Sequence, residues 1–318
     1  MCFSYCPRRI RSMLSNKSLT PTRGFMFQGI RELRGSRGKT ALIITTVLLI
    51  TAMVTLLSSL SAGLSFQSAS ALEYKVGSNQ QLVLNDAGGT VSLSTGSLSD
   101  AQAREVESHD GEVVTMARSK DADGQSFIAM SDNGNKPSEE LYLEHQPIHW
   151  MSTEEVEKLP GSSTFGVVSS DAEPIAGTVM LKGKEALNAS ASYKGEQSSL
   201  NLMIVLLYVI SALVLGAFFT VWTMQRLRGV AITVALGGTR SSILTDAVGQ
   251  ALVVLIVGIS AGTLLTVGVG GFLEGIPMDV STNTTLIPAA ILLLAGLLGA
   301  GLSIIPVMKV DPRKAMNS

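Results

Sequence analysis

Residues 40–72 read TALIITTVLLITAMVTLLSSLSAGLSFQSASAL and contain no Asp, Glu, Lys or Arg. Three further segments lack these charges, at residues 197–225, 247–273 and 280–308. Each is longer than the roughly 20 residues that cross a bilayer core as a helix. Polar residues 73–196 separate the first segment from the other three. The sequence therefore predicts an α-helical membrane protein. It has four transmembrane helices in a 1+3 arrangement and a small extracytoplasmic α/β domain between helices 1 and 2.

The distribution of charge predicts the orientation of these helices. Residues 1–39 carry nine Lys or Arg and one acid, whereas residues 73–196 carry nine Lys or Arg and twenty Asp or Glu. Lys and Arg are enriched on the cytoplasmic side of membrane proteins. Both termini are therefore predicted to be cytoplasmic and the acidic domain extracytoplasmic, in a multi-pass protein of the cell (plasma) membrane.

The same pattern divides the chain into segments. Residues 41–64 exceed the roughly 7–15 residues of a signal-peptide core, which favours an uncleaved helix. The sequence around Met26 resembles a natural translation start. Residues 1–25 are therefore interpreted either as a disordered tail or as residues upstream of the true start of translation. The remaining predicted segments are a cytoplasmic amphipathic elbow at 26–39, helix 1 at 40–65, the outer domain at 66–196, helix 2 at 197–225, a cytoplasmic loop at 226–245, helix 3 at 246–273, helix 4 at 280–308 and a cytoplasmic tail at 309–318.

Several sequence features argue against a metal site, a nucleotide site or ion coupling within the chain. Cys2 and Cys6 are the only cysteines, and two ligands without a partner His make a poor metal site. The segment GSRGKT at 35–40 resembles a phosphate loop, but Leu33 stands where the pattern needs Gly. No Asp, Glu, Lys, Arg or His lies deep in a span, which argues against an ion-coupled transporter. We expect no catalytic residue, no metal and no cofactor of its own.

The outer domain reads as alternating strands and short helices. Capping-box patterns begin at Ser99 and Ser152, and Asp-Gly turns occur at 110–111 and 123–124. Strands are predicted at 80–84, 112–118, 125–130, 140–144, 164–169 and 177–181, with helices at about 99–108, 152–159 and 184–190.

The loop between helices 2 and 3 is the most distinctive segment, RLRGVAITVALGGTR at 226–240. It predicts a short apolar helix, ended by Gly237 and Gly238, with basic flanks. Such a segment suits contact with a cytosolic partner. The alternative is a simple re-entry turn that lies on lipid.

This loop resembles the coupling segment of FtsX/MacB-type ABC transporter permeases. The chain is similar to their DevC/HrtB-like branch over nearly all of residues 26–318, through the segments IRELR (30–34), EHQPIHW (144–150), ISALVLGAFFTVWT (210–223), DAVGQA (246–251) and VDPRKA (310–315). Two features depart from the family pattern. Gly229 and Val234 replace a usual acid and a common Lys, and the outer domain is shortened between Met130 and Leu141.

The resemblance implies a homodimer that works with two copies of a separate cytosolic ABC ATPase, which holds ATP and Mg²⁺. The chain would be non-catalytic and bind no nucleic acid. Haem efflux and glycolipid export both occur in this branch, and efflux of an amphipathic small molecule, haem above all, is the function expected. The residues expected to couple to the ATPase are Arg226, Arg228, Val230, Ile232, Ala235, Leu236, Gly237 and Gly238.

Aromatic and ligand-capable residues gather where helices 1 and 2 reach the outer surface. Haem iron takes Tyr, His, Met or similar ligands, and its ring favours aromatic walls. The candidate substrate residues are Phe66, Tyr74, Tyr193, Glu196, Met203 and Tyr208, with Glu73 beside them. The alternative is interfacial anchoring, since Tyr favours this depth. His145 and His149 are interpreted as structural loop residues, because Pro147 disfavours a helix that would join them.

Other functions stay open at this point. An FtsX-like subunit transmits the state of the ATPase to a cell-wall hydrolase and transports nothing. A lipid or glycolipid exporter and a membrane receptor that senses without ATP are further alternatives. The sequence does not identify the substrate or the ATPase.

Overall fold

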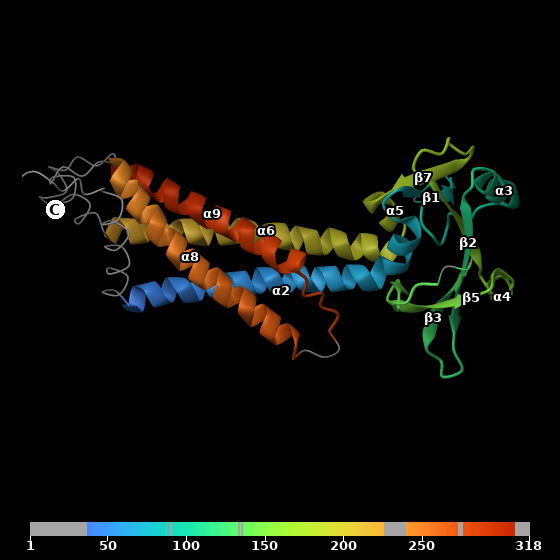
Figure 1. Cartoon of the computed structure of the whole chain (residues 1–318), viewed down its shortest axis with the longest axis horizontal. Helices are drawn as coiled ribbons and strands as arrows, with labels where there is room; N and C mark the ends of the chain where they lie inside the picture. The colour runs from blue at the N-terminus through green and yellow to red at the C-terminus, as the bar shows by residue number, and fades with distance from the viewer. Residues whose placement is uncertain are drawn as a thin grey trace, which may run out of the picture. The chain divides into compact units, whose positions relative to one another are not determined.

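The computed structural model describes residues 37–86, 88–89, 91–132, 134, 136–225, 240–272 and 276–308, and the side chains of most of them. Within these residues, four helices are long and apolar enough to cross a membrane. They are α2 (Arg37–Val76), α6 (Ala191–Gln225), α8 (Arg240–Gly270) and α9 (Thr282–Met308). The strands of a sheet follow α2 and precede α6 in the sequence, so the predicted fold class is confirmed (Figure 1).

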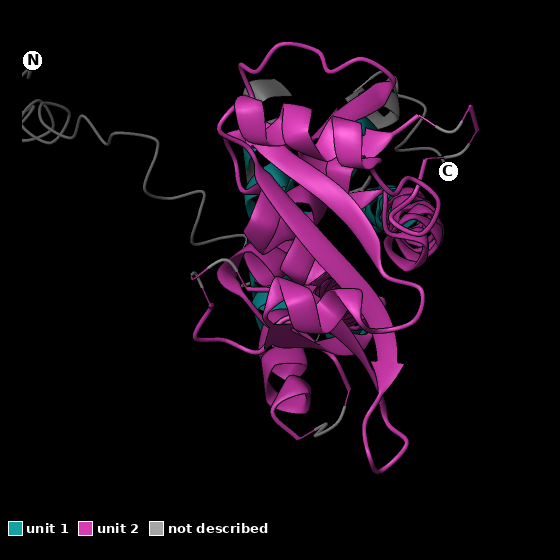
Figure 2. Cartoon of the chain, turned by 90° about the vertical axis from the view of Figure 1, so that its right-hand side faces the viewer, with its two compact units in different colours: residues 1–48, 212–260, 293–318 teal, residues 49–211, 261–292 magenta. Residues whose placement is uncertain are grey.

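The helices begin and end at residues other than those predicted from charge. Helix α2 continues to Val76, and α6 already begins at Ala191. Lys75 and Glu73 therefore lie in a helix, because helix formation needs no membrane and both residues are good helix formers. The chain divides into two compact units, residues 1–48, 212–260 and 293–318, and residues 49–211 and 261–292 (Figure 2). The bounds of these two units differ from the bounds of the segments predicted from the sequence. The division into membrane, outer and cytoplasmic segments stays a prediction.

In the first unit, small residues let helices approach closely. A Cβ added to Gly258 would lie 2.7 Å from Val47 of α2, and one added to Gly299 would lie 3.2 Å from the backbone of Gly216. The hydroxyls of Thr223 on α6 and Ser303 on α9 lie 3.2 Å apart. Here the glycines serve packing within one chain, as expected of small residues in membrane helices.

In the second unit, the helices meet through polar groups and one glycine. The hydroxyls of Thr55 on α2 and Thr266 on α8 lie 2.6 Å apart. The backbone N–H of Asp279 donates to the Ser59 carbonyl at 3.0 Å. A Cβ on Gly63 would lie 2.0 Å from the Pro277 carbonyl oxygen, so only glycine fits where α2 meets the α8–α9 connection.

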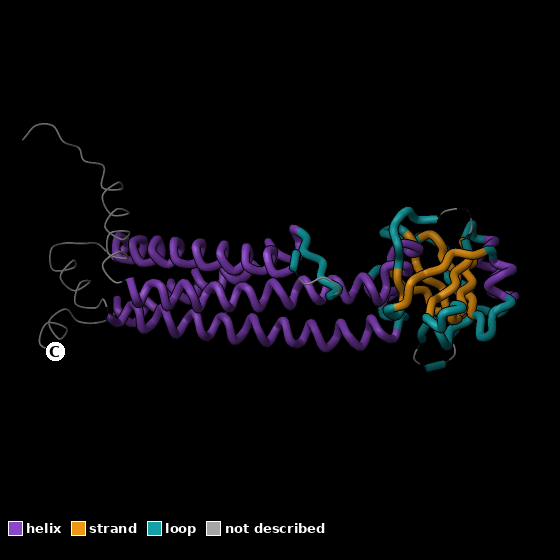
Figure 3. The backbone as a smooth tube through the Cα atoms, turned by 90° about the horizontal axis from the view of Figure 1, so that it is seen from below, coloured by secondary structure: helices purple, strands orange, loops and turns teal. Residues whose placement is uncertain are grey.

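The domain between α2 and α6 contains a seven-stranded sheet in the order β4-β5-β3-β2-β6-β1-β7. Its strands are gathered in one part of the chain (Figures 1 and 3). All neighbours pair antiparallel except β3 and β5, which are parallel. The strands are β1 (Gln80–Asn85), β2 (Glu112–Lys120), β3 (Ser126–Ser131), β4 (Tyr142–Leu143), β5 (Gln146–Met151), β6 (Ser163–Ser169) and β7 (Thr178–Lys182).

Alternate residues of the strands enter cores on opposite faces of the sheet, as the two-residue period of a strand requires. Leu82 and Leu84 of β1 join the main core with Leu72 and Val76 of α2. That core also holds residues of α5 (Lys184–Leu187). Val83 points to the other face, toward Val106 of α3 (Asp100–Ser108). Beside it, Val156 of α4 (Thr153–Glu157) packs on β2 and β3. The last turns of α2 are therefore one wall of the domain's main core.

Both predicted capping patterns are present. The Ser99 N–H donates to Gln102 Oε1 at 2.9 Å, and the Gln102 N–H donates to Ser99 Oγ at 3.4 Å. The Ser152 N–H and hydroxyl donate to Glu155 Oε2 at 3.1 and 2.9 Å. These bonds favour the charged carboxylate and hold the pKa of Glu155 below its ordinary value.

One strand was missed and another predicted too long. The segment predicted as a strand at 140–144 pairs only over Tyr142–Leu143, and β5 follows after a two-residue turn. Glu144 and His145 form that turn, although neither is the Gly or Asn that marks such a turn in a sequence. Pro147 further hides β5, since proline is disfavoured within strands.

Candidate functional site

The six predicted substrate residues lie on two helices of the second unit. Phe66 and Tyr74 are on α2, and Tyr193, Glu196, Met203 and Tyr208 are on α6. Met203 and Phe66 are exposed, at 55% and 42%, and Tyr74 at 39%. Tyr193 is only 8% exposed, so its side chain offers little open surface. Their role in binding a substrate stays a prediction.

Glu196 is the centre of a polar cluster that joins α2, α6 and the sheet. Its Oε2 accepts a hydrogen bond from Ser68 Oγ of α2 at 2.7 Å. Its Oε1 lies 2.6 Å from Nε2 of His145, in the turn between β4 and β5. A carboxylate only accepts, so this imidazole nitrogen carries the proton. The Ser68 hydroxyl also lies 3.3 Å from the same nitrogen.

The turn that carries His145 has an unusual backbone. Glu144 and His145 have φ of 51° and 62°, the left-handed region, which costs a residue with a Cβ about 1–2 kcal/mol. Their backbone N–H groups donate to the carbonyls of Ser68 and Gln67 on α2, at 3.1 and 3.0 Å. Such strain persists where the surroundings fix the conformation, and here α2 and Glu196 fix it.

Neighbouring contacts hold the rest of the β4 strand against α2. The Tyr142 N–H donates to Ser70 Oγ at 2.8 Å, and Ser70 Oγ donates to the Tyr142 carbonyl at 3.2 Å. The Tyr142 ring lies 6.2 Å from the Phe66 ring. Burial, followed by the hydrogen bond and charge of Glu140, raises the pKa of the Tyr142 hydroxyl. Tyr142 therefore stays neutral, and the predicted aromatic site gains a ring from the sheet.

A second cluster ties the end of α2 to the sheet. The ammonium group of Lys75, whose side chain is 4% exposed, lies 2.5 Å from Glu112 Oε1 of β2. It also lies 5.3 Å from the centre of the Trp150 ring. The Tyr74 ring meets the same indole edge-on at 6.2 Å. This cluster is a structural anchor, because Lys75 is covered and its charge is already paired.

The two histidines of the 144–150 segment have different partners. His145 contacts Glu196, whereas His149 stacks on Phe127 at 4.3 Å between ring centres. Across the described residues, no group of three His, Cys, Asp or Glu is placed to hold a metal ion. The sequence interpretation of His145 as a structural residue missed its contact with a candidate site residue 51 positions away, which no local pattern encodes.

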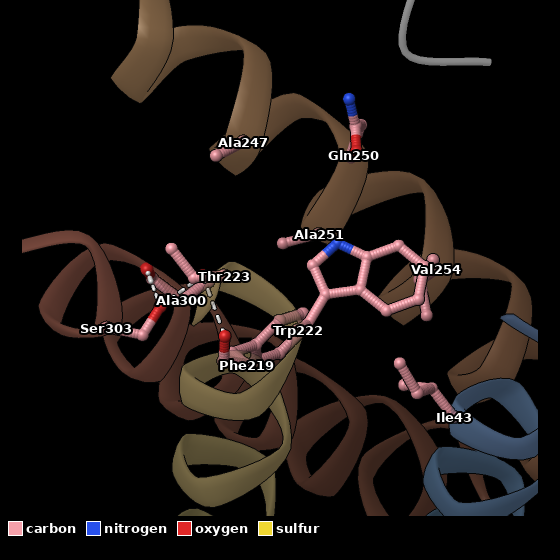
Figure 4. A pocket seen from close by; sticks show the side chains of 10 residues that line it. All are labelled: Ile43, Phe219, Trp222, Thr223, Ala247, Gln250, Ala251, Val254, Ala300 and Ser303. Carbon is pink, nitrogen blue, oxygen red and sulfur yellow. Dashed lines mark hydrogen bonds between the residues drawn. The ribbon is translucent and has the colours of Figure 1, made fainter. Parts of the chain in front are cut away.

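A cavity that the sequence did not indicate lies among the helices of the first unit (Figure 4). It contains about 350 Å³ of space outside the atoms, its open side included. The Trp222 indole forms one wall, with Phe219, Gln250, Val254 and Ile43 around it. Its lining is mostly apolar, and Thr223 and Ser303 bond to each other and to backbone carbonyls.

The residues predicted to contact an ATPase lie outside the described part of the chain. This holds for the whole set from Arg226 to Gly238. The contact at the inner face therefore rests on the sequence alone. The nearest described polar contact is between Lys39 Nζ on α2 and Gln225 Oε1 at the end of α6, at 2.9 Å.

Four helices that are long and apolar enough to cross a membrane, with the strands of a sheet between the first and the second in the sequence, are the pattern of a multi-pass membrane protein. Residues 201–312, which contain α8, α9 and most of α6, match the family described as FtsX-like permease C-terminal. The predicted resemblance to FtsX-type ABC transporter permeases is thereby confirmed.

Curated relatives support the same assignment. Proteins from two strains of Staphylococcus epidermidis are each 29% identical to the chain over 181 residues, which is 54% of this chain and 52% of theirs. One from Staphylococcus haemolyticus is 35% identical over 144 residues, 45% of this chain and 41% of its own. All three are named "Putative hemin transport system permease protein HrtB". The chain thus matches about half the length of these relatives.

Proposed function

We propose that the chain is the permease subunit of an ABC-type exporter that removes an amphipathic small molecule, haem in the first place, from the membrane. The observation that carries the proposal is the Glu196 carboxylate, which lies near the start of α6 against Ser68 of α2 and His145 of the sheet, on a chain with an FtsX-like permease domain. The names of the relatives point to the same substrate class.

The chemistry of haem suits this position. Glu196, Met203 or Tyr208 could each offer a ligand atom for iron at its own level of α6, and Phe66 or Tyr74 could offer a ring face from α2. No Asp, Glu, Lys, Arg or His occurs within residues 197–225 or 40–72. A hydrophilic pore would need such groups. Haem would therefore enter sideways from the outer leaflet, with its carboxylates near the interface and the acidic domain outside the cell.

Energy for export would come from a partner. We infer that two chains form a homodimer and that each binds a cytosolic ATPase subunit, which holds ATP and Mg²⁺, through residues 226–240. Both termini would then be cytoplasmic. The family match supports an ATPase partner, because permeases of ABC systems work with one. The chain itself would catalyse no reaction.

The substrate is tested by the double variant Glu196→Ala/Tyr208→Ala. It is expected to bind haem at least about tenfold more weakly, as the loss of a hydrogen-bonded charged group predicts. Cells should become more sensitive to haem, while membrane abundance and basal ATPase activity stay unchanged. The haem titration uses the Soret band of the purified protein, with His149→Asn as a control outside the site. Unchanged haem binding would mean that Tyr208 and Glu196 only anchor α6 at the membrane interface.

The ATPase contact is tested separately. Replacing Ala235 and Leu236 by Asp should abolish co-purification of the ATPase, because unpaired charge at a docking face is costly. The conservative pair Ala235→Val and Leu236→Met should retain it. Full retention of the ATPase by the Asp variant would mean that the loop only lies on lipid.

Growth of a strain that lacks the gene tests the substrate class. Haem-resistant growth of that strain would favour lipid export or regulation of a hydrolase.

A further inference from the structure

We propose that His145 is a positioning residue that occupies the Glu196 carboxylate in the absence of substrate, so that substrate binding at Glu196 releases the β4–β5 turn from α2 and α6. The proposal rests on the proposed function in naming haem as the substrate and Glu196 as part of its site. Release of the turn would let the sheet domain sense whether the substrate site is filled.

The first support is that both oxygens of the carboxylate are engaged. His145 Nε2 contacts Oε1 at 2.6 Å and Ser68 Oγ contacts Oε2 at 2.7 Å. These are the short distances of hydrogen bonds to a charged group. Glu196 is 29% exposed and His145 36%, so a ligand can reach the pair from outside. An iron centre that takes Glu196 must displace the imidazole or share the carboxylate with it.

The second support is the backbone of the turn. Glu144 and His145 both adopt the left-handed conformation, which residues with a Cβ avoid. A turn of this kind in a two-residue hairpin usually has Asn and Gly. The chain therefore keeps an unfavoured pair at this position. The imidazole is the feature that Asn-Gly would lack, and it contacts a candidate site residue.

The third support is the place of the turn in the sheet. Strand β4 is at one edge of the sheet and pairs with β5 at only two positions. Leu143 is fully buried and anchors the strand in the main core. The turn beyond it is attached to α2 by the N–H groups of Glu144 and His145, and its imidazole contacts Glu196 of α6 as well as the Ser68 and Gln67 side chains of α2. It can therefore leave the helices while the sheet stays paired.

Hydrogen exchange of the full-length protein in detergent measures this release directly. The amides of residues 144 and 145 donate to α2, so their exchange reports whether the turn is attached. The variant His145→Asn keeps a residue that tolerates a positive φ and removes the imidazole. Without ligand, its two turn amides should exchange at least about tenfold faster than in wild type, as loss of a hydrogen bond to a charged group predicts. His149→Asn, on the adjacent strand but stacked on Phe127, should leave them unchanged.

Haem provides the second measurement. Addition of haem to wild type should accelerate exchange of the same two amides, and metal-free protoporphyrin, which lacks the iron, should not. His145→Asn should bind haem several-fold more tightly, because its carboxylate is no longer occupied. A residue that only supported the fold would have the opposite effect on affinity.

The outcomes separate the two proposals. Unchanged exchange in ligand-free His145→Asn, protection of the turn by haem, or weaker haem binding by that variant would overturn the role of His145. Absence of haem binding by wild type would overturn the proposed substrate. The ligand-free comparison of wild type with His145→Asn would then still decide whether the imidazole holds the turn.

Discussion

Single side chains decide how the sheet is fixed to the first helix. Lys75 and Glu112 form a pair in which the two partners differ in exposure, with side chains that are 4% and 32% exposed. The ammonium group is out of water and depends on its carboxylate and on the Trp150 ring. The carboxylate still reaches water. Removal of one partner is therefore not equivalent to removal of the other.

We predict that Glu112→Gln destabilises the protein more than Lys75→Met. The first leaves a buried ammonium group without its counter-charge, which we expect to cost ~1–3 kcal/mol, less than a fully buried pair because Glu112 is partly hydrated. Methionine retains contact with Trp150 and leaves a carboxylate that water can solvate. Thermal unfolding in detergent measures both.

The pair of Arg118 and Glu144, at 2.8 Å, is the control, because its cation is 38% exposed. Arg118→Met is expected to change stability by less than about 1 kcal/mol, as for surface pairs. A loss for Lys75→Met equal to that for Glu112→Gln would contradict the assigned asymmetry.

At the residue level, the sequence selected Glu196 as a ligand-capable residue near the predicted outer end of helix 2, and its role in binding stays a prediction. Its partners Ser68 and His145 were not selected, because they lie 128 and 51 positions away and meet it only when the sheet folds back onto α2. Contacts of that range depend on strand order, which local patterns do not contain.

Among the elements, helices and strands differ in how well the sequence predicted them. Apolar length and capping residues mark helices directly, and all four long helices and both capping boxes were predicted. Strand β5 was missed, because its pairing with β3 is parallel and long-range and its first residues include Pro147.

Close helix approach gives a prediction at the scale of elements. Gly63→Ala should destabilise the second unit by ~1–3 kcal/mol, the range for overpacked cores, since its Cβ would overlap the Pro277 carbonyl. Gly268→Ala on α8 is the matched control. Nothing lies within 4 Å of its added Cβ, so stability should stay equal or rise. Thermal unfolding compares the two, and equal effects would show that α2 does not need glycine at residue 63.

At the scale of the whole molecule, orientation is the property on which the proposed function depends. We predict that Asp123→Cys, at the exposed turn between β2 and β3, reacts with a membrane-impermeant maleimide in intact cells. Gly238→Cys should react only after the cells are opened. Cys2 and Cys6 are first replaced by Ser, since they are the only native cysteines. The reverse labelling pattern would invert the topology and remove the basis for an ATPase contact at residues 226–240.

The continuation of α2 into the main core of the sheet also bears on how the protein is made. Leu72 and Val76 leave the ribosome before any strand and later cover Leu82, Val114 and Phe165. Strand β1 lies between β6 and β7, so the sheet closes on this helix only after residue 182 has been synthesised. The last turns of α2 are thus synthesised before the strands whose core they complete. A gene fragment that began at Gly77 would encode every strand and omit one wall of their core.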